Sequence, residues 1–111
     1  MEKARRKAAL TDYRERKVEP GLYAVRCGTS GEVWVGRAPD LSTIRNRVFF
    51  ALRQGSSPHR TLQAAWNAHG ADSFVFEVLE VLDPEEMGLG LDREMKSRHE
   101  AWMERLGAVR I

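Results

Sequence analysis

Apolar and polar positions follow two different periods along the chain. Between residues 21 and 36 the apolar positions form two short runs around a Gly/Thr/Ser segment, a pattern typical of a β-hairpin. From Leu41 to about Gln54 apolar residues recur every three to four positions, which predicts an amphipathic helix that Gly55 ends. In chain order the expected elements are strands over 22–27 and 32–36, helices over 41–54 and 60–68, a central strand over 73–82 and a helix over 93–106.

The length of the hairpin loop predicts which residues face one another. With Gly28 to Gly31 as the turn, Val25 lies opposite Trp34 and Tyr23 lies opposite Gly36. Side chains alternate between the two faces of a sheet, so Tyr23 and Trp34 are expected diagonally on the same face.

Length and composition indicate a single globular domain. The chain has 111 residues, of which 42% are hydrophobic, and no apolar run approaches the ~20 residues of a membrane span. The basic opening residues lack the apolar segment of a secretory signal, and the one cysteine, Cys27, cannot form an internal disulfide. We therefore expect a cytoplasmic protein with no membrane partner.

Charge is distributed unevenly, although the net charge is only +2. Residues 1–17 carry seven basic and three acidic side chains, and residues 37–60 carry five and one. Residues 72–104 carry ten acidic and three basic side chains. The basic segments favour nucleic-acid phosphates as partners, whereas the plainer alternative is that all these charges lie on solvated helix faces.

The order of several short motifs resembles the GIY-YIG nuclease family. Gly21-Leu22-Tyr23 is followed after ten residues by Trp34-Val35-Gly36, and behind these stand "RAPDL" from Arg37, "LQAAWNAHG" from Leu62 and "FEVLEVL" from Phe76. The resemblance implies an α+β fold, with a small three-stranded antiparallel sheet flanked by helices. Residues 20–111 would form this nuclease domain, and residues 1–19 an extra basic N-terminal helix.

The resemblance also implies an activity and a set of site residues. Such enzymes hydrolyse DNA phosphodiester bonds with one divalent metal, Mg²⁺ or Mn²⁺. Tyr23 matches the tyrosine that orients or deprotonates water, and Trp34 stands where the second tyrosine is expected. Ile44 occupies the position of the phosphate-holding arginine, so Arg47 and Arg45 are the expected catalytic substitutes. The residues expected to bind nucleic acid are Arg37, Arg45, Arg47 and Arg53.

The last helix is expected to supply the metal ligand. Counted from Trp102, the family's glutamate position falls on His99, with Glu100 one step further, and Arg110 stands where a late asparagine is expected. Mg²⁺ prefers oxygen ligands, so either Glu100 is the ligand in a shifted register, or His99 marks an altered or absent metal site.

Three functions remain open from the sequence. The first is a GIY-YIG-type endonuclease of DNA, with catalysis weakened or altered by these departures. The second is a catalytically inactive nucleic-acid-binding module, which explains Ile44, Trp34 and Arg110 with fewer assumptions. The third is a protein-interaction role that uses the charged faces alone.

Overall fold

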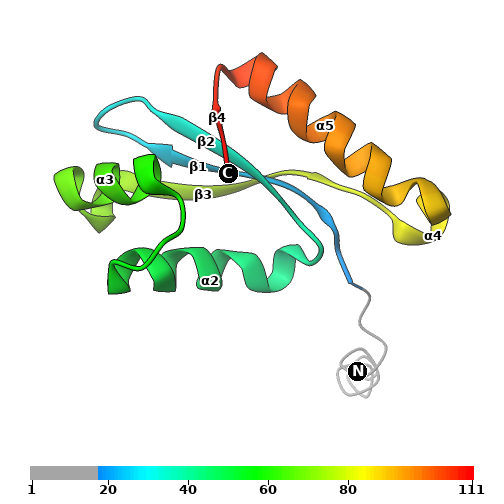
Figure 1. The fold of residues 1–111 in the computed structure, drawn as a ribbon, viewed down its shortest axis with the longest axis horizontal. Helices are drawn as coiled ribbons and strands as arrows, with labels where there is room; N and C mark the ends of the chain where they lie inside the picture. The colour runs from blue at the N-terminus through cyan, green and yellow to red at the C-terminus, as the bar shows by residue number, and fades with distance from the viewer. Residues whose placement is uncertain (1–17) are drawn as a thin grey trace, which may run out of the picture.

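The computed structural model describes residues 18–111 as a four-stranded sheet covered by helices on both faces (Figure 1). Residues 1–17 of the N-terminal helix expected over residues 1–19 lie outside the described residues. The sheet order is β3-β1-β2-β4. The elements are β1 (Gly21–Cys27), β2 (Val33–Ala38), α2 (Leu41–Gln54), α3 (Arg60–His69), the 3₁₀ turn η1 (Ala71–Ser73), β3 (Phe74–Val81), α4 (Pro84–Met87), the 3₁₀ turn η2 (Gly88–Gly90), α5 (Leu91–Leu106) and β4 (Val109–Arg110).

The β1–β2 hairpin has the register that its loop length predicts. Val25 pairs with Trp34 and Tyr23 pairs with Gly36 in an antiparallel ladder. The amide of Cys27 donates to the carbonyl of Glu32 at 2.9 Å, which closes the turn. Tyr23 and Trp34 both belong to one buried cluster, so they share a face of the sheet as expected.

The two faces of the sheet have separate cores. Helices α2 and α3 lie against one face and α5 lies against the other (Figure 1). Alternate residues of β1 divide accordingly, since Tyr23 and Val25 join the α2–α3 core while Leu22 and Ala24 turn the other way. The α2–α3 core consists of Tyr23, Val25, Cys27, Trp34, Ala38, Leu41, Val48, Leu52, Leu62, Ala65 and Phe74.

Helix α2 begins and ends where its sequence predicts. The Asp40 side chain accepts a hydrogen bond from the amide of Ser42 at 3.1 Å, which satisfies one of the free amides of the first turn. Gly55 follows the helix with φ of 74°, a left-handed conformation that favours glycine. These two ends fix which side chains α2 presents to the sheet.

Two expectations about the sheet are corrected by the structure. The strand expected in the centre, β3, lies at an edge, and β1 is central. Valine is favourable on an edge strand as well as on a central strand. In β3 the side chains of Val75 and Val78 are exposed. The sheet also has a fourth strand, β4, which pairs in parallel with β2. A strand of two residues is too short to show an alternation of apolar and polar positions. The expected sheet of three antiparallel strands therefore did not include β4.

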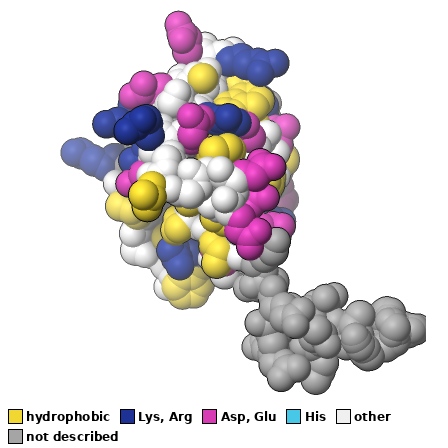
Figure 2. Space-filling model, turned by 90° about the vertical axis from the view of Figure 1, so that its right-hand side faces the viewer, with side chains coloured by type: hydrophobic (Ala, Val, Ile, Leu, Met, Phe, Trp, Pro, Cys, Tyr) yellow, Lys and Arg dark blue, Asp and Glu magenta, His cyan; other side chains and the backbone are white. Residues whose placement is uncertain are grey.

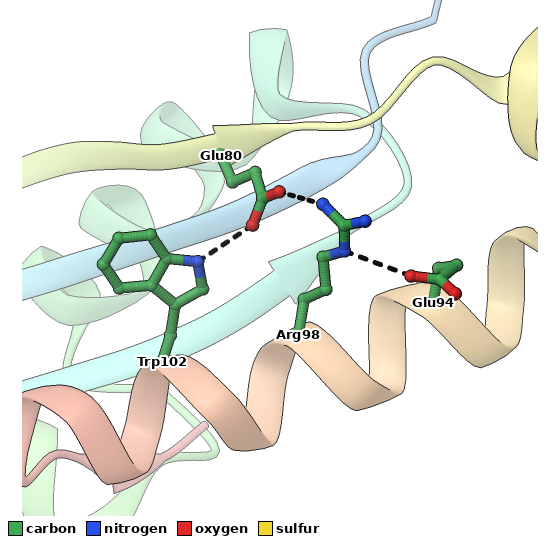
Figure 3. Close-up of polar contacts among 4 residues, drawn as sticks. All are labelled: Glu80, Glu94, Arg98 and Trp102. Atoms are coloured by element: carbon green, nitrogen blue, oxygen red, sulfur yellow. Dashed lines mark hydrogen bonds and ion pairs between the residues drawn. The ribbon is translucent and has the colours of Figure 1, made fainter.

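Helix α5 is fixed to β3 by a polar cluster that includes Glu80 (Figure 3). The Glu80 carboxylate accepts hydrogen bonds from the guanidinium of Arg98 and, at 3.0 Å, from the indole of Trp102. Arg98 also donates to Glu94, one turn earlier, at 3.1 Å. This cluster joins one side of α5 to β3, while Met95 and His99 are the buried residues of the helix. No helix within residues 18–111 combines the length and apolar character needed to cross a bilayer.

Candidate functional site

Tyr23 is held in the sheet with its hydroxyl close to Gly36. The side chain is only 3% exposed, and its ring stacks on Phe76 with the centroids 5.2 Å apart. A Cβ atom at Gly36 would lie 2.5 Å from the tyrosine oxygen, so glycine opposite Tyr23 leaves the room that the phenol occupies. Burial raises the pKa of Tyr23 to about 12. At neutral pH the group is therefore a hydrogen-bond donor rather than a phenolate base.

A small cavity joins Tyr23 to α2 and to the loop that follows it. Its volume is about 120 Å³. Arg47 of α2, which lies one helical turn after Ile44, lines this cavity. The cavity is lined by Tyr23, Ile44, Arg47, Val48, Ala51, Ser57, Pro58 and His59. Of the residues that the sequence nominated, the structure brings Tyr23 and Arg47 together here, with an apolar side chain at position 44.

His59, which the sequence analysis did not name as a site residue, also lines this cavity. It is half-buried, at the residue that precedes α3. Burial lowers the pKa of its imidazole below the usual value near 6.5, so the ring is neutral at pH 7. One feature of the sequence could have indicated that His59 lies near Tyr23. His59 belongs to a short connection between two helices, α2 and α3, that pack on the same face of the sheet.

Trp34 lines no part of the cavity. It is fully buried, and its indole N–H donates to the hydroxyl of Thr61 at 2.9 Å. Its ring also lies 6.2 Å, centroid to centroid, from that of Phe74. Trp34 therefore connects β2 to the start of α3, which places the loop that carries His59.

The remaining arginines nominated by the sequence lie in different surroundings. Arg45 is exposed on α2, with its guanidinium 5.6 Å from the ring centroid of Phe49. Arg53 is exposed in the last turn of α2. Arg37 belongs to the opposite face of the sheet, where it shares a surface pocket with Met95 of α5. Arg45, Arg47 and Arg53 thus extend along one helix, whereas Arg37 does not join them.

His99 and Glu100 lie on the α5 side and are adjacent but differently placed. His99 is 2% exposed, and its Nε2 lies 2.8 Å from the carbonyl oxygen of Val35. A carbonyl only accepts, so Nε2 carries the proton and Nδ1, which has no hydrogen-bond partner, is bare. Glu100 is exposed, and its carboxylate lies 3.7 Å from the guanidinium of Arg110.

The pKa of His99 is lowered chiefly by burial. The nearby positive charges of Arg110 and Arg37 lower it further, against opposing contributions from the Val35 carbonyl and Glu100. His99 is therefore a neutral imidazole at pH 7. Arg37, His99, Glu100 and Arg110 form a second group, separated from the Tyr23 cavity by the sheet.

Potential metal ligands are dispersed over residues 18–111. Within the part of the chain that the structure describes, no three His, Cys, Asp or Glu side chains lie together where they could hold a metal ion. Neighbouring residues on a helix point about 100° apart, so His99 faces the sheet while Glu100 faces solvent and pairs with Arg110. The two side chains therefore do not converge on one ion, and the metal-binding role suggested by the resemblance stays a prediction.

Acidic and basic side chains are mixed on the face drawn in Figure 2, and neither sign covers it. A one-signed surface is found instead on α2, whose fourteen residues include three arginines and no carboxylate. The electrostatic feature adjoining the Tyr23 cavity is therefore a positively charged helix.

Comparison with known proteins places these features in a known fold. No family model matches the sequence, and no curated protein matches it. Among solved structures, the catalytic domain of homing endonuclease I-TevI is similar with a TM-score of 0.70 and 25% identity, over 83% of this chain and 97% of that one. A mutant catalytic domain of intron endonuclease I-TevI gives a TM-score of 0.67 and 26% identity, over 81% and 86%. The similarity supports a nuclease function, and the chain has the GIY-YIG-like nuclease fold.

Proposed function

We propose that this domain is a nuclease that hydrolyses phosphodiester bonds of DNA at the Tyr23 cavity. The observation that carries the proposal is the meeting of Tyr23 and Arg47 in one cavity, within a fold similar to an endonuclease catalytic domain. A cavity of about 120 Å³ suits a small reacting group such as a phosphate rather than a large organic ligand.

Two cavity residues and two further arginines of α2 have roles that their chemistry supports. The guanidinium of Arg47 stays protonated and can pair with two phosphate oxygens, which offsets the charge that develops during hydrolysis. The Tyr23 hydroxyl is protonated at neutral pH and can donate to a phosphoryl oxygen or to the attacking water. Arg45 and Arg53 continue the positive surface of α2 and would contact the backbone on either side of the cleaved bond.

Dependence on Mg²⁺ or Mn²⁺ follows from the resemblance alone. The side chains of His99 and Glu100 face different surroundings and do not converge on one ion, so we assign no step to a metal. The requirement is decided by comparing cleavage with Mg²⁺, with Mn²⁺ and with chelator.

Strand scission by the purified full chain tests the proposal. Supercoiled plasmid and an end-labelled single strand are incubated with wild type, with Tyr23→Phe, and with His69→Gln as a control on the exposed end of α3. We expect wild type and the control to cut, and Tyr23→Phe to cut at least about tenfold more slowly because it lacks the hydroxyl donor. Absence of scission by wild type under every condition overturns the proposal.

The second candidate function is a nucleic-acid-binding module without catalysis. It is favoured by Ile44, which gives the cavity an apolar wall where the resemblance expects an arginine, and by the pairing of Glu100 with Arg110. Wild type that binds DNA but cuts neither substrate would support this function. Charge reversal of Arg45 and Arg47 then separates it from a protein-interaction role, since unchanged DNA affinity would exclude binding through α2.

A further inference from the structure

We propose that His59 is a catalytic residue, the proton acceptor for the attacking water. The inference rests on the proposed nuclease function and adds to it a group that the sequence analysis did not name. It is carried by the presence of His59 in the same cavity as Tyr23 and Arg47, and by the nature of the other residues around the cavity.

The loop that carries His59 is fixed on both sides. The Gln63 side chain donates to the carbonyl of Leu52 at 3.1 Å and accepts from the amide of Ser57 at 3.1 Å, so it joins the end of α2 to the loop. The amide of His59 donates to the Ser57 hydroxyl at 3.1 Å. Pro58, immediately before His59, restricts the backbone further. The backbone that carries the imidazole is thus held by ordered neighbours, as a catalytic group requires.

The other cavity residues cannot accept a proton at neutral pH. From β1, Tyr23 has its pKa raised to about 12, so its phenolate is rare. From α2, Arg47 offers N–H donors and no acceptor, and from the loop, Ser57 contributes a hydroxyl, which is not a base at neutral pH. The remaining lining residues are apolar, and no carboxylate lines the cavity.

His59 has the properties that this step needs. Its burial keeps the imidazole neutral at pH 7, so one ring nitrogen has a free lone pair. In the proposed step the water oxygen bonds to phosphorus while a proton of that water passes to the His59 nitrogen. The bond from phosphorus to the leaving oxygen breaks, its electron pair stays on that oxygen, and solvent supplies the proton there. Imidazolium then returns its proton to solvent.

Single-turnover cleavage by His59→Gln tests the inference, with His69→Gln as the matched control. Loss of a general base costs roughly 10²- to 10⁴-fold in rate. We expect a loss of about a hundredfold or more for His59→Gln, DNA affinity within about twofold of wild type, and an unchanged rate for the control. Added imidazole should partly restore cutting by His59→Gly. Circular dichroism and DNA affinity establish that each variant is folded.

The pH dependence provides a readout that a structural role would not change. The wild-type rate should fall about tenfold per pH unit below the pKa of His59, which lies under about 6.5, because imidazolium cannot accept a proton. This acid limb should vanish in His59→Gln. Equal rates and equal pH profiles for wild type and His59→Gln overturn the inference while leaving the nuclease function intact. Wild type that never cuts overturns both.

Discussion

Gly36 lies directly across the hairpin from Tyr23, and a Cβ atom placed there would meet the tyrosine oxygen at 2.5 Å. Because both positions are buried, Gly36→Ala must displace the phenol or the strand. Overpacking of this kind typically costs about 1–3 kcal/mol of unfolding free energy. Urea denaturation measures the loss. A Gly36→Ala protein as stable as wild type would contradict the close contact.

A double-mutant cycle isolates the Gly36–Tyr23 contact from other effects of the substitution. Alanine at position 36 fits the space that Tyr23→Ala vacates, so the double variant should be more stable than the sum of the two single losses predicts. Additive losses would mean that the cost of Gly36→Ala arises elsewhere.

Arg47→Ala should weaken DNA binding and reduce its salt dependence. A lost phosphate contact lowers the slope of log affinity against log salt by about one. Arg93→Ala, an exposed arginine at the start of α5, is the matched control and should keep the wild-type slope. Fluorescence anisotropy with a labelled duplex at several salt concentrations gives both slopes. Identical slopes for the two variants would remove Arg47 from the phosphate-binding surface.

His99 should make stability depend on pH. The pKa of the buried imidazole is lower in the folded protein than the value near 6.5 of the unfolded chain, so protons bind the unfolded state preferentially. Its contribution is fully present above about pH 6.5 and is lost as pH falls toward the lowered pKa. Between pH 7.5 and 5.5, wild type should lose more unfolding free energy than His99→Gln, measured by urea denaturation. His69→Gln should follow wild type, and a His99→Gln curve parallel to wild type would contradict the assignment.

Glu80 should be needed for the attachment of α5. Glu80→Ala removes the acceptor used by Arg98 and by Trp102, whereas Glu80→Gln keeps an amide oxygen for Trp102 but loses the charge (Figure 3). We expect the urea midpoint to decrease in the order wild type, Glu80→Gln, Glu80→Ala. Trp102 fluorescence should change most in Glu80→Ala. Equal midpoints for all three would show that the cluster does not stabilise the helix.

Local patterns were sufficient to predict most of the fold. The loop from Gly28 to Gly31 fixed the hairpin register, and Asp40 and Gly55 gave both ends of α2. The strand order of β3 and the existence of β4 depend on tertiary packing, which propensity does not encode. The composition of β3 does not distinguish an edge strand from a central one. The two residues of β4 are too few to show the alternation of apolar and polar positions that marks a strand.

The candidate site was predictable only in part. The motif position of Tyr23 and the helical spacing of Arg47 from Ile44 led to two residues that share the cavity. His59 was missed because the sequence does not show which way a loop folds between two helices. Counting from Trp102 led to His99, with Glu100 as the alternative in a shifted register, and the sequence did not show that the helix turns these adjacent residues to different surroundings.

Single-turnover cleavage of a labelled DNA by wild type, Arg47→Ala and Arg93→Ala tests the central claim most directly. The claim is that the cavity of Tyr23 and Arg47 is the reaction site. It predicts cutting by wild type and by Arg93→Ala at equal rates, and a rate about a hundredfold lower for Arg47→Ala, the typical cost of removing a donor that stabilises developing charge. Equal cutting by all three proteins, or cutting by none, would contradict it.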